Sequence, residues 1–213
     1  MSTSETPAGI PADDAPATKR RITPADILPH AEYARRRKEF RDRRIAAKRL
    51  RRLEVGPHAT VLFENYDSMW LQVQEMLHVE KGGDAQLADE LAAYNPMVPQ
   101  GDELTATMML EIDDPARRAR ILARLGHIED HVAIRVGGER VRALPEGDVD
   151  RTNAAGKASA VHFFHFPFTR AQIVAFRDPS VEAAFEIAHP EYGHIALIPP
   201  AMRAELAKDF APG

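Results

Sequence analysis

The stretch Val61–Glu80 concentrates the side chains that could do chemistry. Its sequence, VLFENYDSMWLQVQEMLHVE, predicts a short apolar strand that runs directly into an amphipathic helix. Polar side chains crowd the junction and the helix: Glu64, Asn65, Asp67, Gln72, Gln74, Glu75, His78 and Glu80. A packed strand and helix cannot expose all of these groups, so some of them must lie near the core. We therefore expect a site built from carboxylates or amides in this segment.

A second candidate is the strand VHFFHFPF at residues 161–168. Because successive side chains of a strand point to opposite faces, His162 shares a face with three phenylalanines and His165 points the other way. An imidazole among phenyl rings favours the neutral form, since burial penalises its charge. His162 then either forms a hydrogen bond inside the core or ligates a metal, and the first is the commoner role.

Two further clusters give weaker signals. Glu75 and His78 form a Glu-x-x-His pair on one helical face, but bundle-type di-iron proteins need two such motifs and this sequence shows one. The turn HPEYGH could bring several polar groups onto an ion, or its proline and glycine could only shape the backbone. The sequence leaves open whether these turn residues join the site: His189, Glu191, Tyr192 and His194.

The elements that position these residues alternate between helices and strands. A hairpin is predicted over residues 53–65, and further strands over residues 104–112, 131–136, 139–144, 158–168, 181–188 and 194–198. Helices are predicted over residues 31–50, 67–80, 85–94, 115–125 and 169–177, with a short one after residue 199. We therefore expect a single α+β domain over residues 23–213, mainly an antiparallel sheet with flanking helices. Residues 1–22 are rich in Pro, Ala, Ser and Thr and are predicted to form a disordered tail.

The charge of the chain is unevenly distributed. Lys and Arg outnumber Asp and Glu by 14 to 7 in residues 1–53, whereas the rest of the chain carries 14 against 25. The excess lies mainly in a predicted N-terminal basic helix over residues 31–52, which offers Arg36, Arg43, Arg44 and Arg51 to a partner. An acidic protein, the acidic body of the chain itself, or nucleic acid could meet this helix. Nucleic acid has the least support, because the helix carries few aromatic residues and the pI is about 6.1.

Composition excludes several classes of site. Cysteine is absent, which rules out disulfides, cysteine nucleophiles and an iron–sulfur cluster held by cysteines of this chain. There is no glycine-rich nucleotide-binding loop and no Gly-x-Ser-x-Gly motif, so we expect no nucleotide cofactor and no serine hydrolase. No apolar run approaches the roughly 20 residues that span a bilayer, and the N-terminus lacks the apolar region of a secretory signal. These features lead us to expect a cytoplasmic protein.

Six blocks of the sequence, taken in order, resemble a bacterial protein family. They are TPADILPHAEYARRRKEFR, LFENYDSMWLQVQEM, AYNPMVP, TATMMLEI, SAVHFFHF and HPEYGH, within residues 22–210. Together they are similar to the family known as domain of unknown function 3501. Its genes often lie beside genes for rubrerythrin-like and iron–sulfur oxidoreductase proteins, so the resemblance implies an iron or peroxide-stress context. It also implies polar positions within the apolar blocks: Glu64, Asn65, Gln74, Glu75, Glu111, His162, His189 and Tyr192.

Two hypotheses follow from these observations. In the first, one buried site binds iron or another divalent non-haem metal through Glu64, Glu75, Glu111 and His162. The protein would then be an accessory or redox protein of oxidative-stress defence, with a rubrerythrin-like or iron–sulfur redox protein as its partner. In the second, it is a non-catalytic interaction protein whose basic helix docks an acidic partner. The sequence does not decide between an enzyme and a binding protein.

Overall fold

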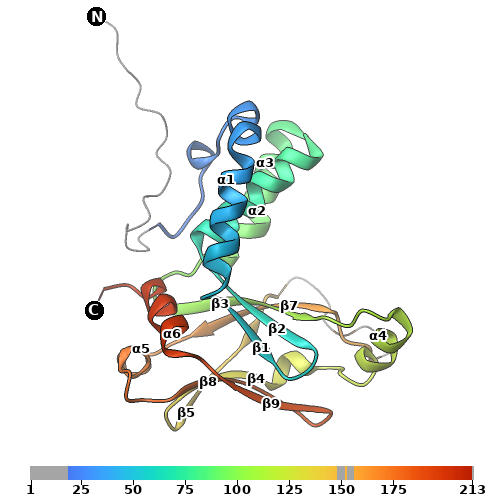
Figure 1. Cartoon of the computed structure of the whole chain (residues 1–213), viewed down its shortest axis with the longest axis vertical. Helices are drawn as coiled ribbons and strands as arrows, with labels where there is room; N and C mark the ends of the chain where they lie inside the picture. The colour runs from blue at the N-terminus through green and yellow to red at the C-terminus, as the bar shows by residue number, and fades with distance from the viewer. Residues whose placement is uncertain (1–18, 148–151, 153–155, 213) are drawn as a thin grey trace, which may run out of the picture.

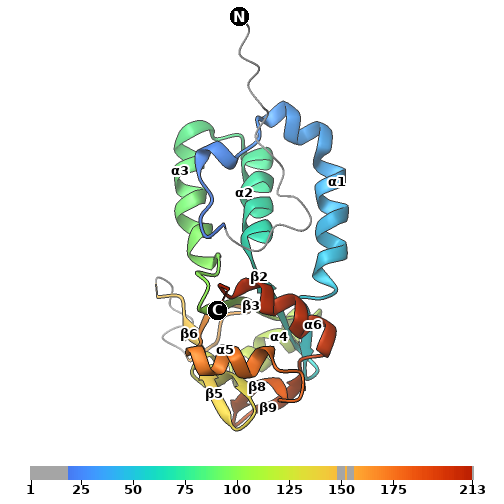
Figure 2. The same cartoon turned by 90° about the vertical axis from the view of Figure 1, so that its left-hand side faces the viewer.

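Three of the helices stand together at one end of the molecule, and the strands lie at the other end (Figure 1, Figure 2). The computed structural model describes residues 19–147, 152 and 156–212. Three helices stand together at one end and are called the helical layer: α1 (His30–Lys48), α2 (Tyr66–Glu80) and α3 (Gly83–Tyr94). The other end holds the antiparallel sheets together with the shorter helices. This arrangement confirms the predicted α+β class, with antiparallel strands and flanking helices.

The strands form two sheets. The first has the order β1-β2-β3-β7-β6 and contains β1 (Arg52–Val55), β2 (Ala59–Glu64), β3 (Glu103–Leu110), β7 (Val161–Pro167) and β6 (Leu144–Pro145). The second has the order β5-β4-β8-β9 and contains β5 (Glu139–Arg142), β4 (Val132–Val136), β8 (Ala183–His189) and β9 (Tyr192–Leu197). The hairpin signals predict these strands but not their division into two sheets.

The inner faces of the two sheets meet in an aromatic core. Phe185 on β8 places its ring 6.2 Å from that of Phe63 on β2 and 5.7 Å from that of Phe166 on β7. Alternate side chains of β3 point to opposite faces of the sheet. Met108 is fully buried in this core, whereas the Thr107 hydroxyl donates to the Glu64 carboxylate beneath the helical layer. The first sheet therefore has an inner face against the second sheet and an outer face toward the helices.

A second, smaller core holds the helical layer together. The ring of Phe40 on α1 lies 5.8 Å from that of Tyr33 and 5.1 Å from that of Trp70 on α2. These three residues are buried, and Phe163 on the outer face of the sheet packs against the same cluster. The narrow apolar stripe of α1 is thus enough to dock one side of a largely polar helix.

Local capping signals set the ends of several helices. Asn65 caps α2 by accepting from the backbone nitrogen of Ser68, whereas the sequence pattern favours Asp67 or Ser68 as the cap, two or three residues later. Asp114 caps α4 (Pro115–Leu122) and Thr169 caps α5 (Arg170–Arg177), close to the starts predicted at residues 115 and 169. The remaining helical segments are α6 (Pro200–Leu206) and the 3-10 turns η1 (Pro24–Asp26), η2 (Asn95–Met97), η3 (Ile128–His131) and η4 (Ala207–Asp209). No helix in the described ranges is long and apolar enough to cross a membrane.

The predicted disordered tail is too long at its C-terminal end. Residues 1–18 lie outside the described residues, but residues 19–22 contact the folded body. Ile22 is 1% exposed, and Arg20 Nη1 donates to the carbonyl oxygens of Pro99 and Asp209 at 2.9 and 2.7 Å. The composition of the tail conceals this anchor, because its partners lie far away in the sequence.

Candidate functional site

His162 is a core histidine with a hydrogen bond to the backbone. It lies on the inner face of β7, is 0% exposed, and stacks on Phe164 with ring centroids 6.0 Å apart. Its Nε2 is 2.9 Å from the carbonyl oxygen of Ser159, which can only accept, so this nitrogen carries the proton. Its Nδ1 lies 3.8 Å from a carboxylate oxygen of Glu129.

Glu64 lies at the end of β2 on the other face of the same sheet. Its carboxylate accepts from Arg44 Nη2 at 3.2 Å and from the hydroxyl of Thr107 at 2.8 Å. Glu64 is 4% exposed, and burial lowers the pKa of the Arg44 guanidinium while the carboxylate opposes this effect. The Arg44–Glu64 ion pair that joins α1 to the sheet is thus almost completely shielded from solvent.

Glu75 joins α1 to α2. Arg37 donates to its two oxygens at 2.9 and 2.7 Å, and the Tyr33 hydroxyl donates to it at 2.5 Å. The Arg37 hydrogen bonds, with help from Tyr33, hold the pKa of the Glu75 carboxyl at about 2 against the opposing effect of partial burial. This carboxylate is committed to the helix interface.

Glu111 lies beyond the end of β3 and is half exposed, with 49% of its side chain accessible. It accepts from the hydroxyl of Thr60 at 2.5 Å and from Arg52 at 3.1 Å. Thr60 is near the start of β2, whereas Glu64 ends that strand. Glu111 and Glu64 are therefore separated by most of the length of β2.

The four predicted metal ligands are not brought together. Glu64 and His162 lie on opposite faces of the sheet, Glu75 faces α1, and Glu111 lies at the far end of β2. Within the described part of the chain, no three His, Asp or Glu side chains are grouped so that they could hold a metal ion. The prediction of one shared buried site is thus not supported in its geometry, and iron binding by the protein stays a prediction.

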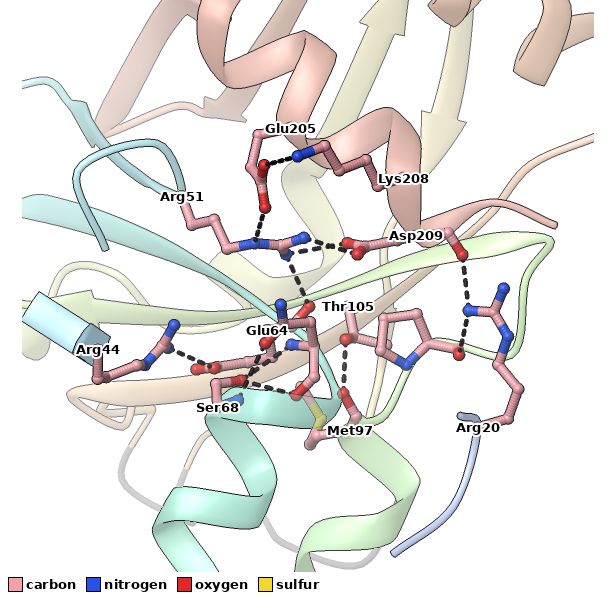
Figure 3. A network of polar contacts seen from close by, with 12 residues as sticks. Arg20, Arg44, Arg51, Glu64, Ser68, Met97, Thr105, Glu205, Lys208 and Asp209 are labelled. Atoms are coloured by element: carbon pink, nitrogen blue, oxygen red, sulfur yellow. Dashed lines mark hydrogen bonds and ion pairs between the residues drawn. The ribbon is translucent and has the colours of Figure 1, made fainter. Parts of the chain in front are cut away.

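Arg51 corrects the predicted partner-binding set. Its side chain is 1% exposed and donates to both oxygens of Asp209, at 2.9 and 2.6 Å, so it does not face a partner (Figure 3). Burial raises the pKa of the Asp209 carboxyl above its ordinary value, whereas the Arg51 guanidinium lowers it. Glu205 lies 3.5 Å from Arg51 Nε and pairs with Lys208 at 2.8 Å. This network ties the start of β1 to the C-terminal segment.

The other three predicted arginines remain on α1 with varied roles. Arg36 pairs with Glu39 at 3.0 Å and lies over the Phe40 ring, 4.8 Å from its centroid. Arg43 and Arg44 line a groove of about 370 Å³ that also includes side chains of α2 and α6.

A second groove beside α1 has a clear cation excess, and we call it the cationic groove. Its basic side chains are Arg37, Arg41, Arg44 and Lys48, which recur every three or four residues and so share one face of the helix. The groove measures about 290 Å³ and also contains Glu64 and Glu75, the partners of Arg44 and Arg37. Arg41 and Lys48 form no ion pair with any residue that the structure describes. The spacing of the four basic residues can be recognised in the sequence, but the sequence does not show that two carboxylates lie beside them and neutralise half of their charge.

His165 forms a three-residue cluster that sequence reasoning missed. Its Nδ1 is 2.8 Å from Glu103 and its Nε2 is 2.7 Å from Glu146. Hydrogen bonding by Glu103 raises the pKa of the imidazole, partial burial opposes this, and Glu146 adds to the rise. The period-two pattern placed His165 opposite His162, yet its acidic partners come from distant segments.

The HPEYGH turn is structural and does not join Glu64. The Tyr192 hydroxyl donates to the carbonyl of Val55 at 2.8 Å and accepts from the backbone nitrogens of His58 and Ala59, both at 2.9 Å. It thereby ties the β1–β2 turn of one sheet to the other sheet. His189 is bonded to the Gly126 carbonyl at 3.2 Å. Gly56 has φ +70°, and a Cβ there would lie 2.4 Å from the His194 ring, so the turn needs glycine.

Comparison with known proteins places the chain in a family. The family model described as "Protein of unknown function (DUF3501)" matches residues 21–210. A solved structure from Burkholderia pseudomallei, described as a novel protein of unknown function, shares 36% identity and superposes with a TM-score of 0.82. The match covers 89% of this chain and 99% of that one, and no curated protein matches. The chain therefore belongs to the family known as domain of unknown function 3501.

Proposed function

We propose that this protein is a non-catalytic docking protein whose cationic groove holds an acidic segment of a partner protein. Its main support is the cation excess of the groove, where four basic side chains face two carboxylates. Arg41 and Lys48 are exposed and form no ion pair within the described residues, and Arg41 acts on the Glu75 carboxylate only at longer range, so both cations can meet a partner. Complementary charge of this kind steers encounter and selects partners.

The residues of the cationic groove also indicate the sequence pattern of the partner segment. Arg41 and Lys48 are seven residues apart, which separates them by roughly 10 Å along a helix. Ile45 lies between them, lines the groove and is 58% exposed. A segment with two carboxylates about two turns apart and an apolar side chain between them would satisfy all three residues. An acidic amphipathic segment is therefore the occupant we propose.

Nucleic acid fits the same groove less well. Glu64 and Glu75 sit among the basic side chains and would repel a phosphate backbone. The family resemblance supports a rubrerythrin-like or iron–sulfur redox protein as the first partner to try. In that case iron belongs to the partner, and the oxidative-stress role of this chain is accessory.

Charge reversal tests the proposal, with a single reversal elsewhere on the same helix as the control. Arg41→Glu with Lys48→Glu inverts the free charges of the groove, whereas Arg35→Glu inverts an exposed charge on the opposite face of α1. The probes are a purified rubrerythrin-like protein and a labelled peptide in which acidic residues and leucine alternate at successive helical turns. Binding of each probe is measured by fluorescence anisotropy. We expect the double variant to weaken binding at least about tenfold and the control to leave it nearly unchanged.

Two results would contradict docking in the groove. A loss per reversed charge in Arg35→Glu that equals the loss per reversed charge in the double variant would show a diffuse electrostatic effect. Tighter binding of a DNA duplex than of either acidic probe, with a steep salt dependence, would favour nucleic acid instead. Far-ultraviolet circular dichroism of each variant checks that the helix is retained.

A further inference from the structure

A cavity lies in the helical layer, between the start of α1, the end of α2 and α3. It measures about 490 Å³, within the size range of small-molecule sites. Leu28, Leu77 and Leu87 supply apolar walls. The cavity shares no lining residue with the cationic groove. Any ligand bound here is therefore separate from the proposed docking function.

Gln74 lines this cavity and carries an unsatisfied amide nitrogen. The residue is 2% exposed, and its Nε2 has no hydrogen-bond partner among the described residues. A buried amide without a partner lowers the stability of the free protein, and natural cores rarely keep one. Leucine or methionine at this position would pack as well without the cost. The amide is thus better explained by a group that enters the cavity than by packing.

His78 adds a second unsatisfied group on the same wall. Gln74 and His78 are four residues apart on α2 and so face the same direction. The Nδ1 of His78 is buried and has no hydrogen-bond partner in the described part of the chain. Its ring stacks on His30 with centroids 4.9 Å apart, which holds the imidazole in place. Two residues one helical turn apart thus line the same cavity, and each carries a nitrogen atom without a hydrogen-bond partner among the described residues.

The remaining polar groups indicate the charge of that ligand. Lys81, the residue that caps the end of α2, lines the same cavity and contributes a cation. No Asp or Glu is among the lining residues that the structure describes. We propose that this cavity binds a small organic acid, with its carboxylate toward Gln74, His78 and Lys81 and its apolar body against the leucines. Amide and imidazole N–H groups donate to a carboxylate, and the cation adds charge complementarity.

Calorimetric titration of the full-length protein with hexanoate and benzoate tests the site, with hexanamide as the neutral match. We expect saturable binding of at least one acid and binding at least about tenfold weaker for hexanamide. Gln74→Met keeps the volume but removes the amide, and His78→Phe keeps the ring but removes its nitrogens. Both variants are expected to weaken acid binding at least about tenfold.

The stability of these variants separates a ligand site from a structural role. Gln74→Met removes an unsatisfied amide, so its melting temperature is expected to equal or exceed that of the wild-type protein. Loss of acid binding in a variant of unchanged or higher stability supports the site. The proposal is overturned if neither acid binds saturably, if hexanamide binds as tightly, or if both variants bind the acids normally.

Discussion

Arg37 on α1 and Glu75 on α2 form a two-point ion pair, at 2.9 and 2.7 Å, that fastens the basic helix to the rest of the helical layer. The Tyr33 hydroxyl donates to the same carboxylate, so one side chain of α2 accepts hydrogen bonds from two residues of α1. Burial raises the pKa of the Tyr33 hydroxyl, and the nearby carboxylate adds to this effect. A basic helix with few apolar residues thus gains a polar anchor.

Glu75→Gln is expected to loosen this anchor and lower the free energy of unfolding at neutral pH by about 1–3 kcal/mol. The pKa of Glu75 is lowered to about 2 in the folded protein, so its stabilisation is present above the ordinary value of 4.5 and is lost as the pH falls through that value toward 2. Urea unfolding at neutral and acidic pH measures the difference between the two proteins. A difference that stays constant with pH would show that the charge of Glu75 does not stabilise the fold.

The His165 cluster predicts the opposite pH dependence. Its pKa is raised in the folded protein, so its contribution is fully present below the ordinary value of 6.5 and is lost as the pH rises through the folded value. We expect the free energy of unfolding to fall over this interval, and His165→Gln to remove much of the fall. His127→Asn, at an exposed position, serves as the control. An unchanged pH profile in His165→Gln would contradict the assignment.

Local signals were sufficient to predict most elements of this fold. Thr169 caps α5 as its hydroxyl and the following residues indicate, and the Gly137-Gly138 turn joins β4 to β5. The helix predicted over residues 31–50 begins one residue earlier, at His30. It ends at Lys48, because Arg52 already pairs with Leu62 in the β1–β2 hairpin. These features depend on residues that are close together in the chain.

The site was less predictable because its contacts are between distant residues. Arg51 is basic and sits in a basic run, yet its partner Asp209 is 158 residues away. Likewise Glu64 and His162 each fit a buried polar position, but only the register of β2, β3 and β7 shows that they lie on opposite faces. The two-residue periodicity of a strand shows which of its side chains share a face. It does not relate the faces of separate strands until their pairing is known.

Arg51 and Asp209 provide a test of a structural against a surface role. Arg51→Met leaves a buried carboxylate without its main partner and is expected to lower the free energy of unfolding by about 3–5 kcal/mol. The double variant Arg51→Met with Asp209→Leu removes both charges and is expected to recover most of that loss. Chemical unfolding of the three proteins measures this coupling. Additive losses in the double variant would contradict a paired, buried role for Arg51.

The iron prediction is tested by elemental analysis of protein purified with and without air, together with absorption spectra. His162 is bonded to the Ser159 carbonyl, and Glu75 is bonded to Arg37 in a different layer. We therefore expect His162→Ala and Glu75→Gln to leave any bound iron unchanged, because these side chains do not share one environment. His127→Asn is a suitable control at an exposed histidine. Near-stoichiometric iron that is lost in both His162→Ala and Glu75→Gln would instead mean that the two residues converge on one metal in a conformation different from this one.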